Sequence, residues 1–427
     1  MRIGVLAESR PGERRVALPP EAVSALCAAD HAVVVQSGAG RHLYATDDDY
    51  RAAGAEIADS AELIAAQAEL LAVVNPPEPS VIAAMPSGAS LLGLLNPFQE
   101  AQAILALREQ GVSAYALELV PRISRAQSVD ALSSQALVAG YRAALVGAEL
   151  LPRFFPLFMT AAGTIPPARV LVLGAGVAGL QAIATARRLG AVVSGYDVRA
   201  AAADEVRSLG ASFVELNLET QEGAGGYARS QSADFAERQH AALAPFVADA
   251  DVVITTASIP GRAAPLLVTE EMVAGMRPGS VVVDLAAQSG GNCALSKPGE
   301  TGVFNGVSVW GGADVPSQLP VHASKLYGAN VSAFIALLKA GDAADEILAG
   351  SRVTEGGRFV HEGVRKALAP DEAEPAPAVA AEPEGAPEPE PATERATGGE
   401  PRPGSGPEAV AASEPGTDRP DQPEQGE

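Results

Sequence analysis

The glycines of one strand, turn and helix segment carry the clearest chemical signal in this chain. The segment VLVLGAGVAGLQAIATARRLGAVVSGYDVR occupies residues 170–199. Gly174 lets the chain turn out of an apolar strand, Gly176 leaves room where a pyrophosphate approaches the backbone, and Gly179 lets the following helix pack closely. The helix begins near Val177, and its first backbone N–H groups point at the phosphates. This spacing predicts a dinucleotide site, whereas a turn without a ligand would not explain the second strand and its terminal acid.

The acidic residue after that second strand indicates which dinucleotide binds. Asp197 lies 23 positions beyond Gly174, after the apolar run 191–195, where a carboxylate is expected to meet the adenosine ribose. A carboxylate about 4 Å from a 2′-phosphate costs roughly 4 kcal/mol at an effective dielectric constant of about 20, and Arg199 would offset only part of that cost. We therefore expect NAD(H), with Val198 between the two charged residues as a further contact.

Charge, cysteine usage and hydropathy exclude several classes of protein. The formal net charge of −22 over 427 residues argues against binding to nucleic acid or to anionic lipid. The two cysteines and five histidines have no metal-ligand spacing, so we expect a reducing compartment and no metal site. The N-terminus resembles no secretory signal, and prolines and glycines interrupt the longest uncharged stretch, 79–99. We expect a cytoplasmic protein without a membrane span.

Alternating apolar runs and helical patterns predict an α/β fold. The strands expected in the first 120 residues are 3–6, 32–36, 70–74, 90–95 and 114–117. A helical region, 134–151, leads to the glycine-rich unit, and its sheet continues through strands at 251–255 and 280–284. The expected architecture is two Rossmann-like, doubly wound parallel-sheet domains with a ligand cleft between them.

Domain boundaries follow from the same patterns. A helical run at 321–339 is expected to return to the first domain, so that this domain comprises residues 1–135 and 321–370 and the dinucleotide domain comprises 136–320. Residues 371–427 contain no aromatic, leucine, isoleucine or methionine residue and carry more than half of the net negative charge. Such a segment buries too little apolar surface to offset its ordering entropy, which predicts a disordered acidic tail. A solvating linker and a docking tail both fit this composition.

Several further motifs resemble one known family. The segment PRISRAQSVDALSSQA at 121–136 closely resembles the signature loop of the NAD(H)-binding alpha subunit of proton-translocating NAD(P) transhydrogenase. MRIGVLAESRPGERRVALPPE at the N-terminus, TTASIPGRAAP from Thr255, VVVDLAAQSGGNC from Val281 and DVPSQLPVHASKLYGANV from Asp314 look like the same family, in the same order. The resemblance covers roughly residues 1–365.

Alanine dehydrogenase shares this fold and much of the N-terminal pattern, so the chemistry has to separate the two activities. Arg15 matches an arginine that binds the keto acid in alanine dehydrogenases. Their neighbouring lysine is replaced by Asn75, their catalytic histidine by Asn96 and their catalytic aspartate by Gln288. None of these three replacements titrates, whereas amino-acid oxidation moves a proton as well as a hydride. Hydride passage between two nicotinamides needs alignment and exclusion of water instead, so the replacements favour transhydrogenation.

The resemblance implies that the loop 122–133 contacts the nicotinamide end of the nucleotide and presents it to a partner. The residues implied in hydride transfer are Arg122, Gln127, Asp130 and Ser133, and the further cofactor contacts are Ile123, Ser124, Arg125 and Ala126. Arginine can hold a phosphate or amide oxygen, and glutamine and aspartate can fix ribose hydroxyls and the carboxamide. Alternatively, Arg122 and Arg125 are ordinary surface charges, and Ser133 or Ser134 caps the helix that is expected to begin near Ala136.

The resemblance also implies a lid and an adenine pocket. The glycines before Tyr227, including Gly226, would supply hinge freedom for a segment that closes over the bound nucleotide, and a mobile loop without function is the alternative. Gln239 and Ser258 stand at implied nucleotide contacts, although the family often has an apolar residue where Ser258 stands.

The implied activity needs other polypeptides. The resemblance implies a homodimer that binds NADH at the inner face of the cytoplasmic membrane and passes hydride to NADP⁺ on a separate beta subunit, while a membrane subunit conducts protons. No second dinucleotide fingerprint of comparable quality is visible, so NADP(H) is expected on the partner. The alternatives are a soluble NAD-dependent alanine dehydrogenase and a non-catalytic NAD(H)-binding adaptor.

Overall fold

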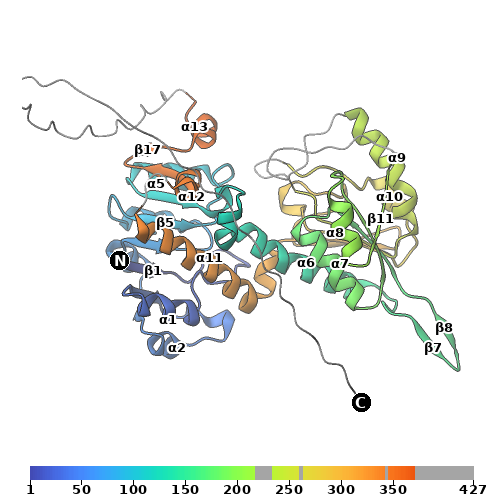
Figure 1. Cartoon of the computed structure of the whole chain (residues 1–427), viewed down its shortest axis with the longest axis horizontal. Coiled ribbons are helices and arrows are strands. Elements are labelled where there is room, and N and C mark those ends of the chain that lie inside the picture. The colour runs from blue at the N-terminus through green and yellow to red at the C-terminus, as the bar shows by residue number, and fades with distance from the viewer. Residues whose placement is uncertain (217–232, 259–262, 342–344, 371–427) are drawn as a thin grey trace, which may run out of the picture. The chain divides into compact units, whose positions relative to one another are not determined.

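The computed structural model describes residues 1–216, 233–258, 263–341 and 345–370. These ranges build two large sheets, each covered by helices on both faces, and a separate two-stranded sheet (Figure 1). The predicted tail 371–427 and the predicted lid around Tyr227 lie outside the described residues.

The first sheet has eight strands in the order β17-β16-β6-β5-β4-β1-β2-β3. Its strands are β1 (Arg2–Val5), β2 (Ala32–Gln36), β3 (Glu56–Ala58), β4 (Leu70–Ala72), β5 (Ser90–Gly93), β6 (Ser113–Ala116), β16 (Arg352–Glu355) and β17 (Arg358–Phe359). Strands β1 to β6 run parallel, whereas β16 and β17 pair antiparallel at one edge. The central strands are almost continuously apolar because helices bury both of their faces.

Two layers of helices enclose this sheet. One face packs against α3 (Ala61–Gln67), α4 (Pro79–Ala84), α5 (Ala101–Glu109) and α13 (Glu362–Leu368). The other face packs against α1 (Pro20–Ala28), α2 (Asp47–Ala52), α11 (Pro320–Ala340) and α12 (Glu346–Ser351). Tyr327 and Phe334 of α11 are fully buried in the second of these cores, so this late helix is anchored among strands from the N-terminal region of the chain.

The second sheet has seven strands in the order β11-β10-β9-β12-β13-β15-β14. Its strands are β9 (Arg169–Leu173), β10 (Val192–Tyr196), β11 (Ser212–Phe213), β12 (Val252–Thr255), β13 (Val281–Asp284), β14 (Thr301–Phe304) and β15 (Val307–Gly311). Its helices are α6 (Ala131–Leu150), α7 (Val177–Arg188) and α8 (Ala202–Ser208) on one face, and α9 (Ala233–Asp249) and α10 (Glu270–Ala274) on the other. Among these described strands, β14 alone pairs antiparallel.

Both sheets have the doubly wound strand order. Numbered along the chain within each sheet, the parallel strands follow the order 3-2-1-4-5-6, so each sheet reverses direction beside its first strand. The predicted fold class is therefore confirmed. The antiparallel strands β14, β16 and β17 were not predicted, and neither were the parallel strands β3, β11 and β15, because strands of two to five residues carry little apolar periodicity.

Short elements complete the fold. The 3-10 turns are η1 (Arg41–Leu43), η2 (Leu117–Leu119), η3 (Ser124–Val129), η5 (Ala287–Ser289) and η6 (Val315–Gln318). The two-stranded sheet is a hairpin of β7 (Phe158–Thr160) and β8 (Gly163–Ile165), both of which are exposed along their length.

The approach of α6 to α7 depends on a glycine. A Cβ atom added at Gly140 of α6 would lie 2.0 Å from the carbonyl oxygen of Ala178, at the start of α7. That atom belongs to a backbone, which cannot move aside as the end of a flexible side chain can.

We predict that Gly140→Ala lowers the free energy of unfolding by more than about 3 kcal/mol, since the two helices would have to separate. The matched control is Gly275→Ala, where the nearest atom is at an ordinary 3.5 Å and the change should stay within about 0.5 kcal/mol. Urea unfolding followed by circular dichroism measures both. Equal stabilities of the two variants would contradict the close contact.

Candidate functional site

The glycine-rich turn has the backbone geometry that its sequence predicts. Gly174 has a φ of +100°, which only glycine adopts without strain, and Thr256 Oγ1 donates a 3.0 Å hydrogen bond to its carbonyl oxygen. A Cβ atom at Gly179 would lie 1.8 Å from that same oxygen. Gly174 and Gly179 therefore let the first turn of α7 sit directly on the end of β9.

The middle glycine has a different role. Gly176 precedes α7 as its N-cap residue, and a Cβ atom added there would meet nothing within 4 Å. Gly176 and Val177 are both exposed at the start of this twelve-residue helix. The N–H groups of the first turn thus face open space, which fits an anionic ligand such as a pyrophosphate.

Asp197 and Arg199 bind each other in the structure. Arg199 Nε and Nη2 each lie 2.9 Å from a different carboxylate oxygen of Asp197, and the Ala175 amide donates to the same carboxylate at 2.8 Å. With the Arg199 backbone amide, each Asp197 oxygen accepts two hydrogen bonds, which fills its lone pairs. A ribose hydroxyl at this carboxylate would have to replace a donor of Arg199.

The remaining predicted adenosine contacts lie in different environments. Gln239 is fully buried, its amide nitrogen donates to the Tyr196 hydroxyl at 2.9 Å, and its Oε1 has no hydrogen-bond partner among the described residues. Ser258 is exposed, and Val198 is half-buried. Gly226 and Tyr227 lie outside the described residues. The roles given to these five residues stay predictions.

The loop 122–133 lines a cavity. Six of its predicted cofactor residues lie around a space of about 390 Å³ together with Leu117, Glu118, Val120, Pro121 and Leu132: Arg122, Ile123, Ser124, Ala126, Gln127 and Asp130. The loop's centre is the turn η3, and its end is the start of α6. The structure therefore brings these residues together, while their contact with a nucleotide stays a prediction.

Arg125 and Ser133, two of the predicted loop residues, bond to other side chains of the protein and so stabilise the loop. Arg125 Nη1 lies 2.6 Å from Asp345, the residue that caps α12. Ser133 donates from its backbone amide (2.9 Å) and its hydroxyl (2.6 Å) to the two carboxylate oxygens of Asp130. Asp130 is thus the N-cap of α6, so the capping role that the sequence left open belongs to Asp130, and Ser133 supplies the donors.

Helix α6 connects the loop to the glycine-rich turn. Its cap is Asp130, and Gly140, ten residues further on, touches the first turn of α7. At a rise of about 1.5 Å per residue, the two points are roughly 15 Å apart along one helix. The spacing between the predicted nicotinamide contacts and the predicted phosphate site is therefore set by a single rigid element.

Arg15 forms a buried ion pair with Glu13. The Arg15 Nε and Nη2 atoms donate to the two Glu13 oxygens at 2.8 and 2.7 Å, and Nη1 donates to Gln135 Oε1 at 2.9 Å. The Arg15 residue is only 7% exposed. Burial alone raises the pKa of Glu13, but the hydrogen bond and charge of Arg15 outweigh it and bring the pKa to about 2. The Arg15 guanidinium therefore binds other side chains of the protein, although its position matches the arginine that binds the keto acid in alanine dehydrogenases.

At two of the three replaced positions, Asn75 and Gln288, the side chain makes internal hydrogen bonds, and at the third, Asn96, the backbone amide donates to Glu118. The Asn75 side-chain amide donates to Glu13 at 2.9 Å and to Glu8 at 3.3 Å. Asn96 has a φ of +46°. Gln288 exchanges hydrogen bonds with Asp314, accepting from its amide at 2.9 Å and donating to its carboxylate at 3.3 Å.

Two half-buried carboxyl groups, Glu8 and Glu118, were missed in the sequence. Glu8, which follows β1, accepts hydrogen bonds from the Val74 and Asn75 amides after β4. Glu118, which follows β6, accepts from the Leu95 and Asn96 amides after β5. Burial raises the pKa of each to about 7, against the lowering effect of the hydrogen bonds. Glu8 and Glu118 each follow a parallel strand closely, and this position could have marked them in the sequence as candidate site residues.

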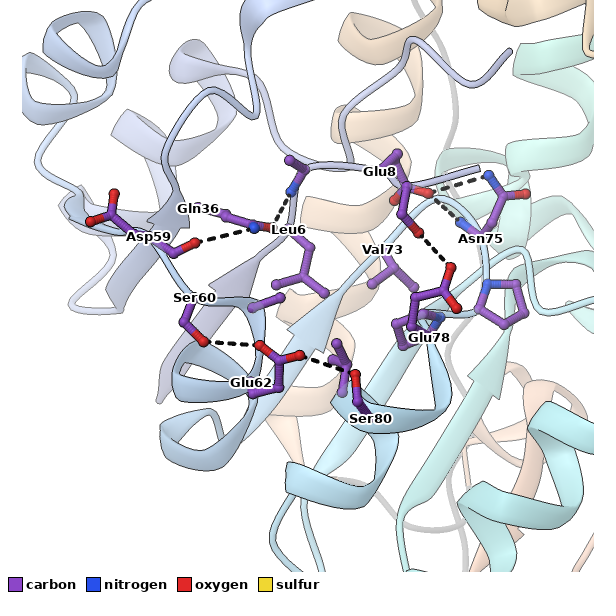
Figure 2. A pocket seen from close by; sticks show the side chains of 16 residues that line it. Leu6, Glu8, Gln36, Asp59, Ser60, Glu62, Val73, Asn75, Glu78 and Ser80 are labelled. Carbon is purple, nitrogen blue, oxygen red and sulfur yellow. Dashed lines mark hydrogen bonds between the residues drawn. The ribbon is translucent and has the colours of Figure 1, made fainter. Parts of the chain in front are cut away.

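Glu8 belongs to a second cavity. Figure 2 shows Glu8 and Asn75 joined by hydrogen bonds in the wall of a space of about 290 Å³, which Glu78 and Glu62 also line. Ser60 and Ser80 both donate to Glu62 there. This cavity lies at the carboxyl ends of β1, β2 and β4.

Neither a metal centre nor a membrane span is evident in the described ranges. No group of three or more histidine, cysteine, aspartate or glutamate side chains is arranged there to hold a metal ion. None of the helices seen in residues 1–216, 233–258, 263–341 and 345–370 is long and apolar enough to cross a membrane.

Two doubly wound sheets, a glycine-rich turn after β9 and an acid after β10 are typical of an NAD-binding oxidoreductase of the Rossmann type. Family models match almost the whole described chain: the N-terminal domain of alanine dehydrogenase/PNT over residues 4–139 and the C-terminal domain over 143–364. The chain therefore belongs to the alanine dehydrogenase/PNT family.

Individual relatives place it within this family. The chain is 46% identical over 376 residues to the first of the polypeptides that form the NAD(P) transhydrogenase subunit alpha of Rhodospirillum rubrum, covering 84% of this chain and 98% of that one. The alanine dehydrogenase of Mycolicibacterium smegmatis is 31% identical over 382 residues, covering 86% and 97%. A transhydrogenase structure from Sinorhizobium meliloti matches with a TM-score of 0.76 and 41% identity, covering 85% and 100%. The transhydrogenase relatives are the more similar.

Glu8 predicts a specific pH dependence of stability. Its folded-state pKa of about 7 lies above its ordinary value of 4.5, so the folded state holds the proton more tightly. The resulting stabilisation is complete below pH 4.5 and is lost as the pH rises through about 7.

We expect Glu8→Gln to remove this titration, so that the stability of the variant relative to wild type rises by roughly 1–3 kcal/mol between pH 5 and 8. Urea unfolding across that range measures the difference. The control is Glu62→Gln on the same cavity, because hydrogen bonds to its own amide, Ser60 and Ser80 lower the pKa of Glu62 and keep it ionised throughout. A flat difference for Glu8→Gln would refute the assignment.

Proposed function

We propose that this chain binds NADH and passes its hydride to NADP⁺ held by a separate subunit, as the NAD(H)-binding alpha subunit of a proton-translocating transhydrogenase. When bound, NADH supplies the hydride. The exposed N-terminus of α7 would hold the pyrophosphate, Asp197 the adenosine ribose, and the loop 122–133 the nicotinamide end. The 46% identity with the Rhodospirillum rubrum alpha-subunit polypeptide supports this assignment.

One observation favours hydride exchange over amino-acid oxidation: the Arg15 guanidinium is bound on three nitrogens by Glu13 and Gln135. A keto acid needs a free cation for its carboxylate. Freeing Arg15 would leave Glu13 buried without its partner, which typically costs several kcal/mol. The neutral Asn75, Asn96 and Gln288 add no group that could carry a proton at the reacting carbon.

The chain's own residues then have three tasks. The glycine-rich turn binds and orients one end of the coenzyme through backbone N–H groups. The loop residues Gln127 and Asp130 align the other end for transfer at close range, which is where most of the acceleration of such a reaction arises. The carboxylate charge of Asp197 would disfavour a 2′-phosphate, with Arg199 offsetting part of that effect, and would so favour NADP(H) on the partner subunit.

The proposal includes an assembly. Partner subunits would carry the NADP(H) site and the proton channel, and would hold this chain at the inner face of the cytoplasmic membrane. The relatives named as an alpha subunit, or as one portion of it, support the existence of such partners. A homodimer is proposed from the β7–β8 hairpin, whose side chains Phe158, Met159 and Ile165 are apolar and exposed, Met159 by 74%.

Asp130→Asn tests the role of the loop. Asparagine is also a good N-cap, so α6 keeps its cap while the carboxylate charge is lost. We expect hydride transfer to slow by about tenfold, or about 1.4 kcal/mol, while the Kd for NADH changes by less than about threefold. The assay mixes the full chain with the NADP(H)-binding component loaded with NADPH and follows a single turnover of hydride from NADPH to an NAD analogue on this chain, which is the reverse of the proposed direction.

Asp48→Asn, an exposed position on α2, is the control and should leave the transfer rate unchanged. An unaltered rate in Asp130→Asn would refute the role of the loop. Reduction of NAD⁺ by alanine with the purified chain would refute transhydrogenation in favour of an alanine dehydrogenase. Tight NADH binding without any transfer in the mixture would instead indicate an adaptor.

The hairpin makes the dimer testable. Replacing both Phe158 and Met159 with aspartate places four charges in the proposed two-fold interface, and we expect the dissociation constant of the dimer to rise at least about tenfold. Sedimentation equilibrium over a concentration series measures it. Val303→Asp changes an exposed valine (68%) on the edge strand β14 and should leave dimerisation intact. Identical association of all three proteins would exclude the hairpin as the interface.

A further inference from the structure

Asn330, a buried residue of α11, binds the backbone of the loop 122–133 at its turn η3. Asn330 Nδ2 donates a 2.8 Å hydrogen bond to the backbone carbonyl of Ser128, 202 positions earlier in the chain. Its Oδ1 accepts a 2.6 Å hydrogen bond from the Ser134 hydroxyl in the first turn of α6. One carboxamide therefore joins the end of η3 to the start of α6, on either side of Asp130.

The support behind Asn330 is rigid. Asn330 is 7% exposed and lies between Tyr327 and Phe334 along α11, two aromatic residues that are fully buried in the core of the first sheet. The Tyr327 hydroxyl also donates to the Val73 carbonyl at 2.8 Å, which fixes α11 to the segment after β4. Movement of Asn330 would therefore require movement of a packed helix.

Gln135 links the Asn330–Ser134 hydrogen bond to the buried ion pair of Arg15 and Glu13. Gln135 Nε2 donates to the Ser134 hydroxyl at 3.3 Å and to the Ala323 carbonyl of α11 at 3.1 Å, while Gln135 Oε1 accepts from Arg15. The start of α6 is thus bound by α11 on one side and by Arg15 on the other. Arg15, which matches a substrate-binding arginine of alanine dehydrogenases, therefore helps here to hold the loop 122–133 through Gln135.

We propose that Asn330 is a positioning residue for hydride transfer, and that Ser134 acts with it. By fixing the Ser128 carbonyl relative to α6, Asn330 sets the orientation of Gln127 and the Asp130 cap without touching the coenzyme. The inference rests on the proposed function of the loop. Its chemical basis is that transfer between two rings depends on alignment, where a displacement of about 1 Å can cost a factor of about 100.

The test compares Asn330→Leu and Ser134→Ala with Ser332→Ala in the full chain. Leucine keeps the volume of Asn330 and removes both hydrogen bonds. Ser332 is the matched control because it lies on α11 and its hydroxyl is buried without a hydrogen-bond partner among the described residues. Three quantities are measured: the Kd for NADH, the single-turnover rate of hydride transfer with the NADP(H)-binding component, and hydrogen exchange of the amides in 122–133.

The expected result is a transfer rate lowered at least about tenfold in Asn330→Leu and about threefold or more in Ser134→Ala, with the Kd for NADH within about threefold of wild type. Exchange in the loop should accelerate in both variants, and Ser332→Ala should match wild type. If Asn330→Leu does not fold, Ser134→Ala alone decides the question.

Three results would overturn the inference. Wild-type transfer rates in both variants would show that the loop needs no such support. Equal losses of affinity and rate would show a general structural role and not a positioning one. Absence of transfer in the wild-type mixture would instead refute the proposed function, and the positioning role would fall with it; this case is recognised from the wild-type arm alone.

Discussion

The buried ion pair between Arg15 and Glu13 is the interaction on which the arrangement of this site depends. Two charges have been removed from water, and the pair is stable there only because both Glu13 oxygens and three guanidinium nitrogens have hydrogen-bond partners. Ser317 and Asn75 donate to the same carboxylate. The ion pair is therefore bonded to Asn75 after β4, to Gln135 of α6 and to Ser317 of η6. Movement of any of these three residues would remove a hydrogen bond from a buried charge.

That constraint also limits the chemistry. A dehydrogenase that anchors a keto acid needs a cation that faces its ligand, whereas this guanidinium faces its own protein. The neutral amide at Asn75 bridges Glu8 and Glu13 where the dehydrogenase pattern has a lysine. The charge of Arg15 is already balanced by Glu13, whose pKa the hydrogen bond and charge of Arg15 lower to about 2, so this site does not attract a carboxylate substrate.

Helix α6 connects the ion pair to the residues predicted to contact the coenzyme. Its first turn is capped by Asp130 and bound by Asn330, its own Gln135 donates to α11, and its middle lies against α7 because Gly140 has no side chain. Helix α6 therefore contacts both predicted coenzyme sites: the loop 122–133, predicted to hold the nicotinamide, and the glycine-rich turn, predicted to bind phosphate. A flexible connection would lose the alignment that hydride transfer requires.

The sequence by itself determined several local features: most of the parallel strands from their apolar runs, the turn at Gly174 from its glycine spacing, and the family from the loop at 121–136. These depend on residues close together in the chain, whose conformational preferences and burial patterns are visible without a fold. The same reasoning gave Arg15 a substrate-binding match and overlooked Glu8, Glu118 and Asn330.

Those residues acquire their roles from partners far away in the chain. Asn330 and Ser128 are 202 positions apart, Arg15 and Gln135 are 120 apart, and Ser317 and Glu13 are 304 apart. A hydrogen bond depends on distances of a few tenths of an ångström, and only the packing of α6 and α11 brings these groups within that range. Whether a charged side chain serves a ligand or the protein's own framework was therefore decided by the tertiary structure.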